Sequence, residues 1–164
     1  MNRRKRWVRT GAWAGFVLLF LVICFLSFQT GSATKALEKP FINQVAGVLE
    51  EQPSEEWLLT AAFYIRQTGR AVLFFALGFC GAAAMGLTFE HADRRLLGGL
   101  LVLLLFGMAY FTEKMKIFIE GRHYAFAECL EGFAFAVLGG VCLCVVLRLA
   151  GRRKAANEQN DAGL

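Results

Sequence analysis

The sequence predicts an all-α membrane protein built as a bundle of four transmembrane helices. Of its 164 residues, 57% are hydrophobic, and they gather in four long runs. An apolar run of about 20 residues crosses a bilayer as a helix. Basic residues cluster at both chain ends and in one short loop, which is typical of membrane topology signals. The expected spans are about 8–28, 69–89, 96–112 and 124–148.

The four runs leave no room for a separate soluble domain. We therefore expect one transmembrane domain, 1–150, and a polar, disordered cytoplasmic tail, 151–164. The first span follows a basic N-terminus, as a signal-peptide core does, but such a core has about 7–15 apolar residues. The run 11–28 is longer, and the small residues at 31–33 make a weak cleavage site, so we expect this helix to be retained.

The segment 29–57 is the longest polar stretch, and it is acidic. Within it, apolar residues recur with helical spacing between Pro40 and Leu49, which favours a short amphipathic helix on the membrane surface. The apolar element that follows, 57–89, is too long for one bare span. Because Arg66 and Arg70 divide it, we interpret its first part as an interfacial lead-in.

Small residues recur every fourth position in two of the spans. Such spacing gives a smooth helix face on which a second helix can pack closely. We therefore expect these two helices to contact each other. The residues are Gly78, Ala82 and Gly86 in the second span, and Gly132, Ala136 and Gly140 in the fourth.

The loop charges predict the orientation. With the N-terminus inside, the loop 90–95 and the C-terminus are also cytoplasmic, and these hold the basic clusters. The acidic segment 29–57 and the charged segment 112–128 then face outward. A net charge of +5 arranged in such blocks does not indicate nucleic-acid binding.

The sequence contains no pattern for a metal or a cofactor. His91 and His123 fall on opposite membrane faces in this topology, and no Gly-rich phosphate loop or metalloprotease motif is present. The five cysteines lie in or beside apolar runs, so we interpret them as packing residues.

The candidate site is the outward-facing segment 112–128 together with the start of the second span. Arg66 and Arg70 share one helix face. At such a short separation their two guanidinium groups repel each other unless an anion lies between them. Glu113, Glu120 and Glu128 are available partners. Arg122 adds a third cation, and Gly121 before it indicates a tight turn that could offer backbone N–H groups to an anion.

Three interpretations of these charges stay open at this point. They could be membrane anchors and surface ion pairs. They could form a pocket in which the arginines hold a phosphate or carboxylate. They could also be an active site in which Glu113 or Glu128 acts as acid or base.

The same segments resemble two signatures of the VanZ-like membrane proteins, a family named for a protein linked to teicoplanin resistance. The first family pattern, R-K-x-x-H-F-x-E-Y-x-x-L-G, is matched at Arg66, Leu77 and Gly78. The second, D-E-x-x-Q-x-x-x-P-G-R-x-x-x-x-x-D-x-x-x-N, is matched at Glu113, Gly121 and Arg122, and Gly139 fits a later family glycine. Other positions depart from the patterns: Arg70, Leu73, Phe74, Thr112, Lys116, Glu120, Glu128 and Gly132. The resemblance implies a cell-envelope role and altered glycopeptide susceptibility.

We therefore predict a multi-pass cell-membrane protein, with both termini cytoplasmic, that binds an anionic lipid headgroup or cell-wall precursor at an outward-facing site. Whether it also processes that ligand stays open. The substrate-binding candidates are Arg66, Arg70, Arg122 and Gly121, and the catalytic candidates are Glu113 and Glu128. The alternative is a small non-catalytic subunit or scaffold whose small-residue faces contact a partner membrane protein or a second copy.

Overall fold

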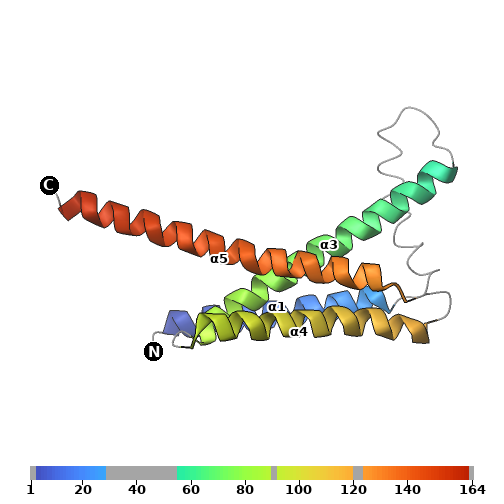
Figure 1. Ribbon diagram of the computed structural model, residues 1–164, viewed down its shortest axis with the longest axis horizontal. Helices are drawn as coiled ribbons and strands as arrows, with labels where there is room; N and C mark the ends of the chain where they lie inside the picture. The colour runs from blue at the N-terminus through green and yellow to red at the C-terminus, as the bar shows by residue number, and fades with distance from the viewer. Residues whose placement is uncertain (1–2, 29–54, 90–91, 120–123, 163–164) are drawn as a thin grey trace.

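The computed structural model describes residues 3–28, 55–89, 92–119 and 124–162 (Figure 1). These residues form four long helices and one short 3₁₀ turn, with no strand among them, which confirms the all-α prediction. The elements are α1 (Arg3–Ser27), α3 (Glu55–Thr88), α4 (Arg94–Lys114), η1 (Met115–Phe118) and α5 (Phe126–Ala162).

Each of the four helices contains a segment long and apolar enough to cross a membrane. These segments are Lys5–Ser27, Thr60–Thr88, Arg94–Phe118 and Phe126–Arg153. Large apolar side chains on them point away from the bundle, and Leu103, for example, is 68% exposed. Such side chains suit a lipid environment, so the expected multi-pass membrane protein is confirmed.

The helices alternate in direction (Figure 1). α1 and α4 lie side by side, and α3 crosses them obliquely. α5 runs toward the same end of the molecule as α3 and crosses it near the middle of both helices. The last turns of α1 and α4 and the first turns of α3 and α5 therefore point to one end of the molecule. We call it the η1 end, because it holds η1. The chain termini lie at the opposite end.

The core draws on every helix. Its buried members include Phe16 and Ile23 from α1, Phe74, Leu77 and Met85 from α3, Leu101, Leu105 and Ala109 from α4, and Cys129 and Ala136 from α5. A polar contact adds to the packing where the Trp13 indole N–H donates to the Thr88 hydroxyl at 2.9 Å. That hydroxyl in turn donates to the Ala84 carbonyl, so the bond joins α1 to α3 without leaving a buried donor unpaired.

The small residues bring α3 and α5 into backbone contact, as the sequence predicts. A Cβ at Gly78 would overlap the Ala136 carbonyl, and a Cβ at Gly139 would overlap that of Phe75. One helical turn further along, Gly140 faces the Ala82 methyl.

Two of the expected small residues have other surroundings. A Cβ at Gly132 would touch the Phe74 ring at 3.1 Å, and Gly86 has no neighbouring atom at its Cβ position. The close contact is therefore limited to the middle of the two helices.

The helix bounds differ from the predicted ones in two places. The segment interpreted as an interfacial lead-in is continuous with its span in α3, because Arg66 and Arg70 are good helix formers that give the backbone no reason to break. The tail, expected to be disordered, continues α5 to Ala162, since the residues after Gly151 include Arg, Lys, Ala and Glu and no proline. The amphipathic helix expected between Pro40 and Leu49 lies outside the described residues.

Candidate functional site

Arg70 connects α3 to both α4 and α5 at the η1 end. Its Nη1 donates to Glu128 Oε2 at 2.6 Å, and its Nη2 donates to Glu113 Oε1. Both contacts are ion pairs as well as hydrogen bonds. A single guanidinium, with its fork of N–H donors, therefore joins two carboxylates from two other helices.

Lys116 contacts the same two carboxylates from a different direction. Its Nζ donates to Glu113 Oε1 at 2.5 Å and to Glu128 Oε2 at 2.9 Å. Each cation thus contacts each carboxylate. We call these four residues, Arg70, Glu113, Lys116 and Glu128, the charge cluster.

Local structure explains how the cluster assembles. Glu113 lies in the last turn of α4, and Lys116 follows in η1, where the 3₁₀ geometry eclipses side chains three residues apart. Glu128 lies in the first turn of α5, where a carboxylate interacts favourably with the helix dipole. Arg70 reaches the pair because α3 and α5 are held together by their glycine contacts.

The four side chains differ in their contact with solvent. Glu113 is fully buried, Lys116 is 8% exposed, Arg70 is 17% exposed and Glu128 is 38% exposed. Charges buried to this degree are tolerated only when they are paired, as these are. Glu128 is therefore the member that an incoming molecule can reach.

Two polar atoms of the cluster are buried without a hydrogen-bond partner among the described residues. They are Arg70 Nε and Glu113 Oε2. An unmade hydrogen bond of this kind costs about 1–3 kcal/mol. The cluster therefore keeps hydrogen-bonding capacity that its own four members do not use.

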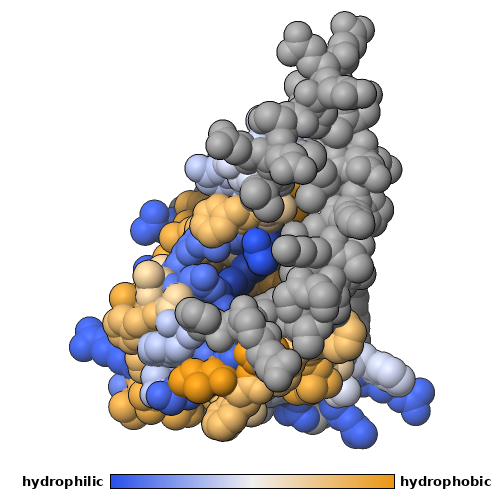
Figure 2. Space-filling view, turned by 90° about the vertical axis from the view of Figure 1, so that its right-hand side faces the viewer, coloured by the Kyte–Doolittle hydropathy of each residue, from blue (hydrophilic) through white to orange (hydrophobic). Residues whose placement is uncertain are grey.

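Two cations at the η1 end each lie over an aromatic ring. The Arg70 guanidinium lies 5.7 Å from the centre of the Phe74 ring, and Lys114 Nζ lies 5.5 Å from that of Tyr124. Tyr124 also meets Tyr110 edge to face. Desolvation raises the pKa of the Tyr124 phenol, and the nearby Tyr110, Cys129 and Glu113 add to that rise. Figure 2, which views this end of the molecule, shows hydrophilic residues gathered between apolar ones.

The structure brings three of the six predicted site residues into contact, namely Arg70, Glu113 and Glu128. Arg66 lies one turn earlier on α3 with an exposed side chain, outside the four-residue cluster. The other two candidates, Gly121 and Arg122, lie outside the described residues, as do His91 and His123.

Sequence reasoning did not single out Lys116 as a site residue. The signal available in the sequence was that Lys116 follows Glu113 by three residues, because side chains three residues apart meet on one helical turn. The hydrogen bond between Gln67 and Glu131 was also missed, since it depends on the register of α3 against α5.

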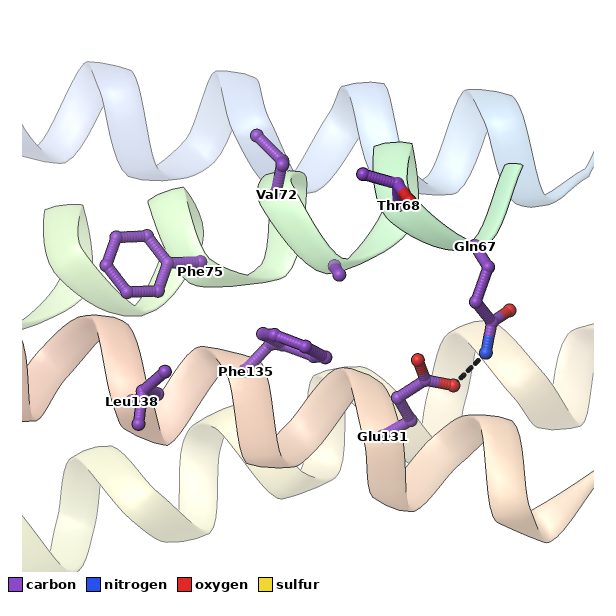
Figure 3. A pocket seen from close by; sticks show the side chains of 8 residues that line it. Gln67, Thr68, Val72, Phe75, Glu131, Phe135 and Leu138 are labelled. Carbon is purple, nitrogen blue, oxygen red and sulfur yellow. Dashed lines mark hydrogen bonds between the residues drawn. The ribbon is translucent and has the colours of Figure 1, made fainter. Parts of the chain in front are cut away.

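A groove lies beside the charge cluster, between α3 and α5 (Figure 3). Its volume is about 380 Å³, within the range of roughly 300–1,000 Å³ typical of small-molecule sites. Gln67 Nε2 donates to Glu131 Oε2 at one end of it, and Phe75 and Leu138 line the other end.

The chemistry open to the cluster is that of two fixed cations and one accessible carboxylate. Within the described ranges, no group of three His, Cys, Asp or Glu side chains is arranged to hold a metal ion. The Thr112 hydroxyl, which adjoins Glu113, is buried and donates to the Ala109 carbonyl at 2.9 Å. The arrangement is therefore suited to holding an anion or to moving a proton at Glu128.

Comparison of the chain with protein-family models, with curated proteins and with solved structures finds no match.

Proposed function

We propose that the protein binds an anionic component of the cell envelope, a lipid headgroup or a cell-wall precursor, at the charge cluster. One observation carries the proposal. Arg70 and Lys116 converge on a single carboxylate oxygen, Oε2 of Glu128, which belongs to the most exposed member of the cluster. An anionic oxygen that entered from outside would find the same two donors at that position.

Binding on this proposal is an exchange. The ligand anion takes the place of the Glu128 carboxylate between Arg70 and Lys116, and Glu128 turns toward water. Glu113 stays in place, because it is fully buried and contacts both cations. It acts as a positioning residue that holds Arg70 and Lys116 at a fixed separation for the ligand.

A catalytic version of the proposal assigns the two carboxylates different roles. Glu128 is the acid or base, because it alone combines exposure with contact to both cations. Glu113 has no exposed surface and positions the cations instead.

The cellular setting of the proposal comes from the loop charges and the family resemblance. With the basic clusters inside, the η1 end faces outward, where envelope precursors and outer-leaflet lipids are found. The resemblance to VanZ-like proteins adds the proposal that loss of the protein changes susceptibility to glycopeptides such as teicoplanin.

Lipid binding by the purified protein tests the proposal. Native mass spectrometry of the protein in detergent, titrated with phosphatidylglycerol or with zwitterionic phosphatidylcholine, measures both affinities. We expect the anionic lipid to bind more tightly, and Lys116→Ala to weaken it by about tenfold or more because a charge-assisted hydrogen bond is lost.

Lys114→Ala is the matched control. Lys114 is two residues away in the chain, but it contacts the Tyr124 ring rather than the cluster. If both lysine variants lost the same affinity for the anionic lipid, the effect would come from general surface charge, and the proposed site would be wrong.

The alternative of a small non-catalytic subunit keeps only part of the small-residue surface on which it was based, because Gly86 is the one glycine of the two faces with no atom near its Cβ position. Gly78, Ala82, Ala136 and Gly140 contact one another within the chain. A partner membrane protein would have to bind elsewhere, and stoichiometric co-purification of such a partner without bound lipid would favour this alternative.

A further inference from the structure

The groove between α3 and α5 follows a second row of contacts that runs beside the glycine contacts. Gln67 bonds to Glu131 at one end of this row, and Phe75 meets Gly139 at the other. Phe135 lies between these two ends (Figure 3), and Ala71 is also among the residues that line the groove. A methyl group is too short to fill the space between the two helices, so the groove stays open along this stretch.

The polar and apolar parts of the groove are separated along its length. Gln67, Thr68 and Glu131 lie at the η1 end, and Val72, Phe75, Phe135 and Leu138 line the rest. Both walls belong to segments apolar enough to cross a membrane. A molecule that fits must therefore be apolar over most of its length and polar at the end toward the charge cluster.

Two residues at the polar end of the groove lie three positions from members of the charge cluster. Glu128 lies three residues before Glu131, which places both carboxylates on one helix face about 4.5 Å apart along the axis. Gln67 and Arg70 have the same spacing on α3. The polar end of the groove is thus one helical turn from the accessible member of the cluster.

We infer that the ligand of the proposed site is a membrane phospholipid with a singly charged phosphodiester headgroup. Its phosphate replaces Glu128 between Arg70 and Lys116, and one acyl chain lies in the groove along Val72 and Phe135. This inference rests on the proposed function and specifies its ligand.

The charges of the site select a phosphodiester over a phosphomonoester. The cluster holds two positive and two negative groups, so a single negative charge in place of Glu128 leaves the balance around Arg70 and Lys116 unchanged. A phosphomonoester carries about −1.5 to −2 at neutral pH and would place excess negative charge beside Glu131. Glu131 instead suits a headgroup hydroxyl that donates a hydrogen bond.

The test fills the groove without touching the cluster. Ala71→Phe and Val72→Trp each add a ring to the residues that line the groove, and Val72 is 61% exposed, so a larger side chain there is not forced into the core. Ala134→Phe adds the same ring to an exposed position on α5 outside the groove and serves as the control. Binding of dioleoyl phosphatidylglycerol to the full chain is measured by native mass spectrometry, alongside the cluster variant Lys116→Ala.

We expect both groove variants to bind the lipid about tenfold more weakly, because an added ring overfills the space that the chain occupies, while the control binds as the wild type does. If Lys116→Ala loses lipid binding and the groove variants keep it, the charge cluster still binds the headgroup. The inference that the groove holds the acyl chain would then be wrong. If Lys116→Ala also keeps binding, the proposed function itself is wrong. Tighter binding of a polyprenyl phosphate than of phosphatidylglycerol would overturn the choice of lipid.

Discussion

Arg70 lies opposite Glu128 in the same register that places Gly78 opposite Ala136. The ion pair joins residues 58 positions apart, and the backbone contact of Gly78 with Ala136 has the same separation. Phe74 against Gly132 and Ala82 against Gly140 complete the row at four-residue intervals. One register thus sets both the helix packing and the position of the ion pair.

Enlarging Gly78 should therefore disrupt the packing of the bundle and the charge cluster together. In Gly78→Leu, the new side chain would overlap the Ala136 carbonyl, which cannot move as a side chain can. We expect loss of the monodisperse peak in size-exclusion chromatography in detergent. Gly86→Leu is the control, because that position on the same helix has no neighbour near its Cβ. Similar behaviour of the two variants would contradict the role of the register.

The register also shows how much of the site the sequence could predict. The four-residue spacing of small residues predicted that the two helices meet, and the contacts of Gly78 with Ala136 confirm it. Two four-residue steps toward the N-terminus lead from Gly78 to Arg70 on α3 and from Ala136 to Glu128 on α5. This pair was therefore within reach of sequence reasoning, since both patterns repeat on one helix face.

The rest of the site depends on geometry that helix periodicity does not carry. Lys116 joins the cluster because α4 tightens into a 3₁₀ turn after Lys114, and no capping residue or proline marks that change. The groove is lined by residues of both α3 and α5, such as Ala71 and Phe135, and their proximity is recognisable only once the register of the two helices is known. The sequence also did not predict that α3 is one unbroken helix, because arginines within an apolar run are typical of the point where a span meets the membrane surface.

Removing the buried carboxylate should destabilise the protein more than removing the accessible one. Glu113→Ala leaves Arg70 and Lys116 without their fully buried partner, and breaking a buried ion pair costs about 3–5 kcal/mol. Glu128 is partly exposed, so solvent screens its ion pairs with Arg70 and Lys116. We therefore expect Glu128→Ala to lower the free energy of unfolding by only about 1 kcal/mol. Unfolding by SDS titration of the protein in mixed micelles measures both. An equal cost would mean that burial does not distinguish the two residues.

Replacing the whole charge cluster should separate stability from binding. A variant with Arg70→Met, Glu113→Leu, Lys116→Leu and Glu128→Leu has no unpaired charge, and such replacements are often neutral or stabilising by about 1–4 kcal/mol. We expect it to fold as well as the wild type in thermal unfolding and to lose its preference for phosphatidylglycerol over phosphatidylcholine. Retention of that preference would assign the cluster a purely structural role.

Neutralising Glu128 should strengthen the binding of an anionic lipid. If Glu128 occupies the position of the ligand anion, Glu128→Gln removes a competitor and one negative charge while keeping the side-chain shape. Arg70 and Lys116 then remain paired with Glu113 and have one positive charge in excess. We expect phosphatidylglycerol affinity to rise by about tenfold, the equivalent of 1.4 kcal/mol, and to fall more steeply with added salt than in the wild type. Weaker binding in Glu128→Gln would instead mean that Glu128 supports the cations when the ligand is bound. In that case the anion would have to enter beside the carboxylate and not in its place.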